Sequence, residues 1–246
     1  MNNRHLAVLC LAMLSIFAIG CKHGSVLTSS NIAQKARTSP HIGDKAVYIA
    51  KNVAPKIPII GGESSGQRTD TIINSGKHRR SLPSYITRTF ELKEDSIKRV
   101  GISPKKHTVI TWFGEDADGN LYLLGDSFDG KPWDYVTNVD PPLYIPSKMK
   151  VGTWWKCIAN FNGGNTESII FQCVGKESVS TPLGNLDAYK INVDYSDTRL
   201  QTKMIGSMWT PQNLPAVFAV KESYDVTNSL LTVNMSYDLE SIELAE

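Results

Sequence analysis

The sequence predicts a mainly β fold, built on an antiparallel sheet with few short helices. Apolar and polar residues alternate from Ala188 to Tyr195 and again from Leu231 to Glu240. One apolar and one polar face per strand is typical of antiparallel sheets, because parallel strands are usually buried on both faces. No stretch longer than about ten residues has the 3.6-residue period of an amphipathic helix.

Alternation and turn residues together predict ten strands. Glu94 to Val100 is the best candidate for a helix, of two turns. The stretch from Ile57 to Arg80 contains Pro58 and four glycines, which predicts a long and partly mobile excursion. The expected strands are Ala46–Ala50, Tyr85–Leu92, Thr108–Phe113, Leu121–Asp126, Trp154–Phe161, Ser168–Lys176, Ala188–Tyr195, Met204–Trp209, Val217–Tyr224 and Leu231–Glu240.

The first twenty residues have the pattern of an export signal. Arg4 gives a positive start, and the uncharged, largely apolar run that follows is shorter than the roughly 20 residues of a membrane span. Small residues, Ala18 and Gly20, precede Cys21, and this ending resembles the bacterial lipobox, with Ala18 where Leu is usual. The resemblance implies a bacterial lipoprotein, cleaved before Cys21 and acylated there. The alternatives are an ordinary secretory signal and an uncleaved anchor.

The remainder divides into a tether and one domain. Residues 21–43, the lipidated cysteine and a stretch rich in Ser, Thr, Asn, Gly and Lys, are expected to be flexible. Residues 44–246 are expected to form a single antiparallel β domain. Lys22 is not the Asp that commonly retains Gram-negative lipoproteins at the inner membrane. The resemblance therefore implies the outer membrane as the location if the cell is Gram-negative.

The net charge indicates which kind of partner to exclude, and the cysteine content indicates whether a disulfide is expected. Removal of Arg4 from 26 basic residues leaves 25 against 24 acidic ones, so we expect no nucleic-acid partner. Cys157 and Cys173 would face an oxidising compartment, where a disulfide is favoured over two separately buried thiols. The turn at residues 162–165 joins their strands and places the two cysteines opposite or nearly opposite. We therefore expect a cross-strand disulfide between Cys157 and Cys173.

Three segments carry a second resemblance. Pro141–Pro146, Lys150–Trp154 and Lys176–Ile191 are similar to conserved stretches in a group of uncharacterised bacterial envelope proteins. The resemblance implies a strongly bent antiparallel sheet, half-barrel or sandwich-like, related in shape to Lol-type lipoprotein carriers. Thr210–Val217 lacks the two glycines that the group has there, so this edge departs from the group's pattern.

Catalytic and metal patterns are weak. Gly62–Gly66 matches the G-x-S-x-G pattern around Ser64, but no amphipathic helix follows and the last histidine is His107. The acidic loop at residues 115–120 lacks the EF-hand spacing; an irregular calcium site with Asp126 and Asp129 is the alternative to a plain hairpin turn. Histidine and cysteine spacing does not favour zinc. We therefore expect no enzyme, no metal and no cofactor.

The remaining features suggest binding surfaces. The basic residues 77–80 and 105–107 are either solvated loops or contacts with anionic lipid. Trp154 and Trp155 point to opposite faces of a strand, so that one belongs in the core and the other packs at a rim or lines an apolar pocket.

These features predict a membrane-anchored lipoprotein that binds an apolar ligand or lipid on a curved sheet without catalysis. The alternative is a structural or assembly component of the envelope that binds another protein. The candidate ligand-binding residues are Trp154, Trp155, Tyr189, Ile191, Val193, Leu231, Val233 and Met235.

Overall fold

The computed structural model describes residues 37–57, 60–78, 81–98, 105–199, 201–228 and 231–245. Across these residues the chain contains strands, turns and irregular segments, and no helix, so none that could cross a membrane. Thirteen strands form one antiparallel sheet. They are β1 (Lys45–Ile57), β2 (Ile60–Asn74), β3 (Ile86–Lys98), β4 (Lys105–Asp116), β5 (Leu121–Phe128), β6 (Asp134–Tyr135), β7 (Leu143–Ile145), β8 (Trp154–Asn160), β9 (Thr166–Thr181), β10 (Gly184–Asp197), β11 (Thr202–Pro211), β12 (Lys221–Thr227) and β13 (Thr232–Glu243).

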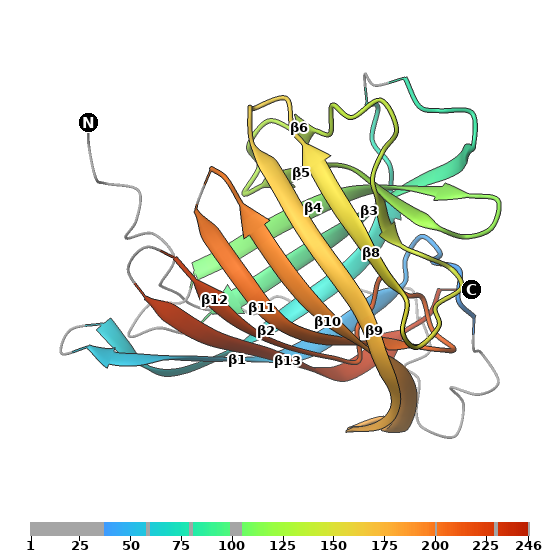
Figure 1. The fold of residues 1–246 in the computed structure, drawn as a ribbon. Coiled ribbons are helices and arrows are strands. Elements are labelled where there is room, and N and C mark those ends of the chain that lie inside the picture. The colour runs from blue at the N-terminus through green and yellow to red at the C-terminus, as the bar shows by residue number, and fades with distance from the viewer. Residues whose placement is uncertain are drawn as a thin grey trace, which may run out of the picture.

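The first and last strands meet in the middle of the sheet. The strand order is β6-β5-β4-β3-β2-β1-β13-β12-β11-β10-β9-β8, with β7 paired to β5. Figure 1 shows the sheet bent back on itself, so that β8 to β12 face β2 to β5. The sheet is not closed into a barrel; at one end an isolated bridge between Val136 and Phe161 links its two margins. The predicted class, a strongly bent antiparallel sheet, is confirmed.

Bulges supply part of the bend. The pairing register shifts by one residue at three places, where the extra residue is Leu124 in β5, Val174 in β9 and Glu240 in β13. A bulge inserts an extra residue into one strand, which bends it and increases its twist. The three bulges lie in both arms of the sheet, so each arm curves toward the other.

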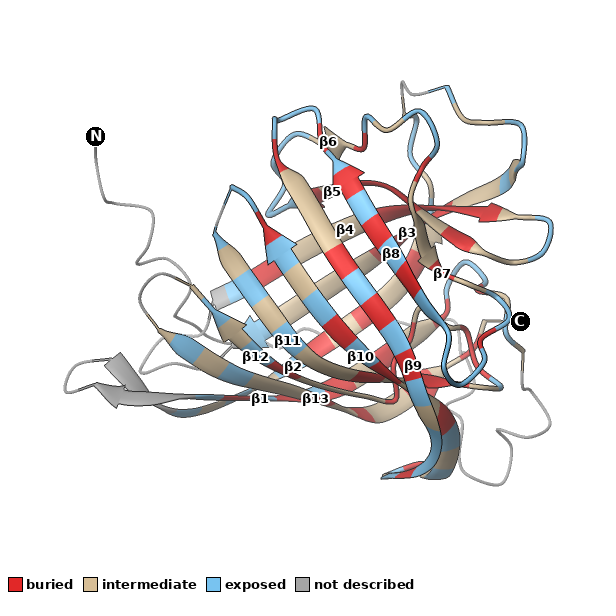
Figure 2. Ribbon diagram, viewed as in Figure 1, coloured by how far each residue is buried: buried red, intermediate tan, exposed pale blue. Residues whose placement is uncertain are grey.

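The core fills the space between the two arms. Along β8, buried and exposed residues alternate strictly, and Figure 2 shows the same banding on β9 and β10. Trp155 stacks on Phe171 with ring centroids 5.0 Å apart, and its indole N–H donates to the Tyr144 carbonyl at 2.9 Å. Buried apolar side chains from both arms belong to one contiguous cluster. The sheet therefore behaves as two facing layers around a single core.

Two predicted elements are wrong. Glu94 to Lys98 belongs to β3 and not to a helix, because β2 and β4 supply hydrogen-bond partners on both sides. The expected excursion over residues 57–80 is mostly strand β2, fifteen residues long, paired with β1 and β3. Two neighbouring strands that satisfy the backbone outweigh the weak strand propensity of glycine and serine. The predicted strand from Val217 begins only at Lys221.

The predicted disulfide is also wrong. The hairpin of β8 and β9 closes at the Asn160–Thr166 pair, so Cys157 lies opposite Ile169. Cys173 lies opposite Thr153, whose carbonyl accepts its amide N–H at 2.8 Å. A stagger of four residues is roughly 13 Å along a strand, well beyond the separation of about 7 Å that a disulfide can bridge. Both cysteines are free thiols, buried on the same face.

Candidate functional site

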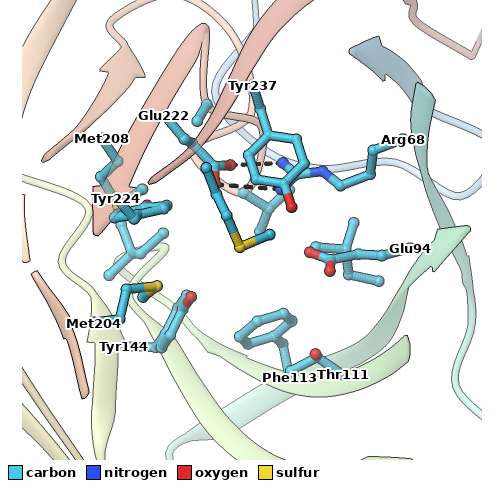
Figure 3. A pocket seen from close by; sticks show the side chains of 15 residues that line it. Arg68, Glu94, Thr111, Phe113, Tyr144, Met204, Met208, Glu222, Tyr224 and Tyr237 are labelled. Atoms are coloured by element: carbon cyan, nitrogen blue, oxygen red, sulfur yellow. Dashed lines mark hydrogen bonds and ion pairs between the residues drawn. The ribbon is translucent and has the colours of Figure 1, made fainter. Parts of the chain in front are cut away.

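A cavity of about 260 Å³ lies inside the bent sheet, between its two arms. Strands β2, β3, β4 and β7 contribute one part of the wall, and β11, β12 and β13 with the segment before β12 contribute the other. Figure 3 shows Arg68 and Glu94 on one side of the cavity and Met204 and Met208 on the other. The lining residues are Arg68, Leu92, Glu94, Thr111, Phe113, Tyr144, Ile145, Met204, Met208, Val217, Ala219, Glu222, Tyr224, Met235 and Tyr237.

Arg68 is the centre of the polar side. Its guanidinium makes a two-point ion pair with Glu222, with Nη2 2.6 Å from Oε1 and Nη1 3.2 Å from Oε2. Its Nε lies 3.1 Å from Oδ1 of Asp70. The rings of Tyr48 and Tyr237 cover it, with centroids 4.3 and 4.4 Å from Cζ. A buried guanidinium is tolerable here because carboxylates and aromatic faces replace its hydration.

Strand periodicity explains why these groups meet. Arg68 and Asp70 are two residues apart on β2 and so share the inner face. Asp70 is directly opposite Glu94 on β3. Glu222 reaches Arg68 from β12, on the other arm, so the ion pair fastens two segments 154 residues apart. The polar cluster is thus a link between the arms as well as part of the cavity wall.

The cluster holds more negative than positive groups. Asp70, Glu94 and Glu222 surround one guanidinium. Burial raises the pKa of Asp70 well above its ordinary value, and the neighbouring carboxylates add to the rise, although Arg68 opposes it. Burial likewise raises the pKa of Glu94, with Glu222 adding and Arg68 opposing. Two neighbouring carboxyl groups that are both withdrawn from bulk water do not both ionise readily.

The opposite side of the cavity is apolar and adaptable. Met204 and Met208 come from β11, and Met235 comes from β13. Methionine has an unbranched, polarizable side chain that adjusts to differently shaped neighbours. Phe113 and Tyr144, with ring centroids 5.2 Å apart, complete this wall. The cavity therefore joins a charged end to an apolar end, which suits an amphiphilic occupant.

The predicted ligand-binding residues are largely not brought together. Met235 lines the cavity, whereas Ile191 and Val193 are buried in the core and Tyr189 lines a second hollow beside the hairpin at residues 115–119. Trp155 is the core member of the tryptophan pair, as one of them was predicted to be.

The other predicted positions lie outside the cavity. Trp154 is 61% exposed on the outer face and does not line the cavity. Leu231 and Val233 are half-buried and do not line the cavity. Arg68, Glu94 and Glu222 were missed. Arg68 lies in the predicted excursion and Glu94 in the predicted helix, while the inward position of Glu222 in its predicted strand was not recognised. The signal that could have identified these residues is a charged side chain at a strand position that faces inward.

The serine-hydrolase pattern and the acidic loop both have structural explanations. Ser64 lies within β2 opposite Asn52, not on a strand-to-helix elbow. The Asp116 carboxylate accepts hydrogen bonds from the amides of Asp118 and Asn120, both at 2.9 Å, and from the Tyr122 hydroxyl at 2.9 Å. It therefore shapes a hairpin turn. Within the described ranges, no three His, Cys, Asp or Glu side chains are grouped to hold a metal ion.

The two histidines of the basic segments contact carboxylates. His78 is buried and its Nε2 lies 2.9 Å from Glu91, while its ring stacks on Trp112 at 3.8 Å. His107 lies 2.8 Å from Asp129. Arg79, Arg80 and the predicted lipidation site Cys21 lie outside the described residues.

Comparison with known proteins finds distant similarities of shape. No protein family matches the chain, and no curated protein matches it. A β-barrel-like protein of a domain of unknown function from Brucella abortus has a TM-score of 0.47 and 8% identity, covering 85% of this chain and 100% of its own. A protein from Bacteroides fragilis, described as exported and YmcC-like in fold, has a TM-score of 0.40 and 11% identity, covering 85% and 99%.

A third solved structure, described as a lipoprotein from Parabacteroides distasonis, has a TM-score of 0.35 and 14% identity, covering 84% of this chain and 97% of its own. At such distances the similarity concerns the arrangement of strands, and function must be argued from the residues of the cavity.

Proposed function

We propose that this chain is a lipid-anchored extracytoplasmic protein that binds an apolar or amphiphilic ligand inside its bent sheet, without catalysis. The observation that carries the proposal is the cavity of about 260 Å³, with three methionines facing a charged end. Typical small-molecule pockets enclose about 300–1,000 Å³. The cavity therefore suits a small amphiphile or the end of a lipid, not a whole two-chain phospholipid.

The anchor is the second part of the proposal. Cys21 would carry the acyl groups, and two or more chains give stable attachment where one gives marginal attachment. The outer membrane is the proposed location if the cell is Gram-negative. Cys21→Ser should move the protein from the membrane fraction to the soluble fraction; retention in the membrane would contradict the anchor.

A cavity-filling variant tests ligand binding. Met204 faces the cavity from β11, whereas Ile205, the next residue, is 50% exposed on the other face. In a full-length chain carrying Cys21→Ser, exported and purified without detergent, we expect n-octanol to bind by calorimetry. Met204→Trp should abolish this binding because the indole occupies the cavity, and Ile205→Trp should leave it unchanged.

The outcome separates two hypotheses. Octanol binding lost only in the inward variant supports the cavity as the site. An unliganded mass by native mass spectrometry, together with no uptake of octanol, would contradict the binding function. Equal effects of both variants would place binding elsewhere on the protein.

A second candidate is an envelope component that binds another protein. The outer face of β8 and β9 exposes Trp154, Ile158 and Ile170, and large exposed apolar residues close together mark interaction surfaces. Here Trp154→Ser should remove one stoichiometric crosslinked partner from intact membranes. A crosslinking pattern unchanged by the substitution would count against this role.

A further inference from the structure

The charges around the cavity do not balance. Of the described residues that line it, Arg68 is the single cation, while Glu94 and Glu222 are acidic and Asp70 lies directly behind Arg68. With all four groups ionised the cluster would carry two net negative charges. Unbalanced charge in a water-poor site is costly, and either protonation or a bound cation relieves it.

Arg68 is not free to receive an anionic headgroup. Both of its Nη atoms bond Glu222, and its Nε faces Asp70. The rings of Tyr48 and Tyr237 cover the guanidinium. A carboxylate or phosphate entering the cavity would have to displace Glu222 or lie unpaired beside it. The cavity is therefore poorly matched to fatty acids and to phosphate headgroups.

Glu94 is the group that lacks a counterpart. It lies on β3 beside Asp70, and its carboxylate has no hydrogen-bonding partner among the described residues. Figure 3 shows it directed into the cavity from the charged side. Glu94 is only half-buried, because part of its surface borders the cavity. It is thus placed to accept a hydrogen bond from an occupant.

The surrounding rings favour the same kind of occupant. Phe113, Tyr144, Tyr224 and Tyr237 line the cavity together with Glu94. Aromatic faces attract cations, and more strongly where water is excluded. The methionines supply an apolar surface beyond the rings. A carboxylate, aromatic faces and an apolar wall together match a cationic head joined to a hydrocarbon tail.

We infer that the cavity binds an amphiphile with a protonated amine, whose ammonium donates to Glu94 while its hydrocarbon part packs against Met204, Met208 and Met235. This inference rests on the proposed binding function and names its ligand class. The ammonium supplies the positive charge that the cluster lacks. The small volume selects a short hydrocarbon chain or the head end of a longer one.

Three probes of equal chain length test whether the cavity prefers an amine. Calorimetry on the full-length Cys21→Ser chain, at a mildly alkaline pH, compares n-octylamine, n-octanol and octanoate. Octylamine should bind roughly tenfold to a hundredfold more tightly than octanol, as a charge-assisted hydrogen bond adds to apolar burial, and octanoate should bind most weakly. Glu94→Gln should reduce octylamine affinity by the same factor.

Asp95→Asn provides the matched control, because it removes a carboxylate from the opposite face of the same strand, where Asp95 contacts Lys93 and Thr108. It should leave octylamine affinity unchanged. Equal affinity for octylamine and octanol would overturn the ammonium inference while the binding function stands. Binding of none of the three probes would overturn both. An equal loss in the two variants would also overturn the role of Glu94.

Discussion

Two groups of buried carboxylates lie inside this sheet, and they are neutralised differently. In the first, Arg68 is enclosed by Glu222, Asp70 and two tyrosine rings. In the second, near the joined margins of the sheet, Asp126 on β5 and Glu167 on β9 come close to Asp197, and the nearby cation Arg199 is about half exposed. One group encloses its cation; the other leaves it at the surface.

The pKa values of carboxyl groups are raised in both groups, and only in the first does an enclosed cation oppose the rise. Burial raises the pKa of Glu167 to about 7, with Asp126 and Asp197 adding to the rise. Burial and Asp134 raise the pKa of Asp126 to about 6. A half-exposed Arg199, 3.2 Å from Asp134, compensates little of this. We conclude that the ion pair of Arg68 with Glu222 links the two arms of the sheet, whereas the cation near Asp126 and Glu167 is half exposed.

The largest expected effect is the loss of the enclosed cation. Arg68→Met should lower the free energy of unfolding by about 3–5 kcal/mol, because Glu222 and Asp70 would remain buried without a counterion. Urea denaturation with two spectroscopic probes measures it. Arg199→Met, which removes an exposed partner, should cost less than about 1 kcal/mol. Equal losses in the two variants would remove the distinction between the groups.

The second expected effect is a dependence of stability on pH. A carboxyl group whose pKa is raised by folding holds its proton more tightly in the folded state. Its stabilising contribution is complete below the unfolded pKa near 4 and is lost as pH rises through about 6 for Asp126 and about 7 for Glu167. The melting temperature should therefore fall between pH 5 and pH 8.

A neutral replacement should remove part of that fall. Glu167→Gln should raise stability at pH 8 by about 2 kcal/mol relative to the unmodified chain, a shift of roughly 4–8 °C, with little change at pH 5. Asp194→Asn, on the outer face of β10, serves as the control and should leave the slope unchanged. The pKa values of Asp70 and Glu94 are also raised by burial, so these two groups should maintain a residual fall of stability with pH. A slope unaltered by Glu167→Gln would contradict the assignment.

The sequence predicted the strands where alternation is regular. Nine of the ten expected ranges lie wholly or nearly wholly in strands, and Ala188–Tyr195 lies inside β10. The strand β2 escaped prediction because Gly62, Ser64 and Gly66 weaken the pattern, and only its neighbours β1 and β3 make it a strand. Pairing partners are long-range information that local periodicity does not contain.

The site was harder to predict than the fold. Arg68 and Glu222 are separated by 154 residues, and nothing in either local pattern indicates that they meet. The apolar stripes were recognised, but Ile191 and Val193 serve the core while Met235 faces the cavity. Which part of a continuous inner face is filled and which is hollow depends on side chains from the other arm of the sheet. That choice is made only in three dimensions.

The smallest expected effect concerns the two cysteines, and it tests the register next to the Asp126 group. Burial, with Glu167 adding, raises the pKa of the Cys157 thiol to about 12, so it should react slowly while the protein is folded. A reducing agent should shift the melting temperature by less than about 1 °C, because no disulfide joins Cys157 and Cys173. Alkylation under denaturing, non-reducing conditions, followed by peptide mapping, should label Cys157 and Cys173 fully. A crosslinked peptide joining them would require β9 to slide by four residues along β8, which would take Ile169 away from Cys157 and move Glu167 from its place beside the other carboxylates.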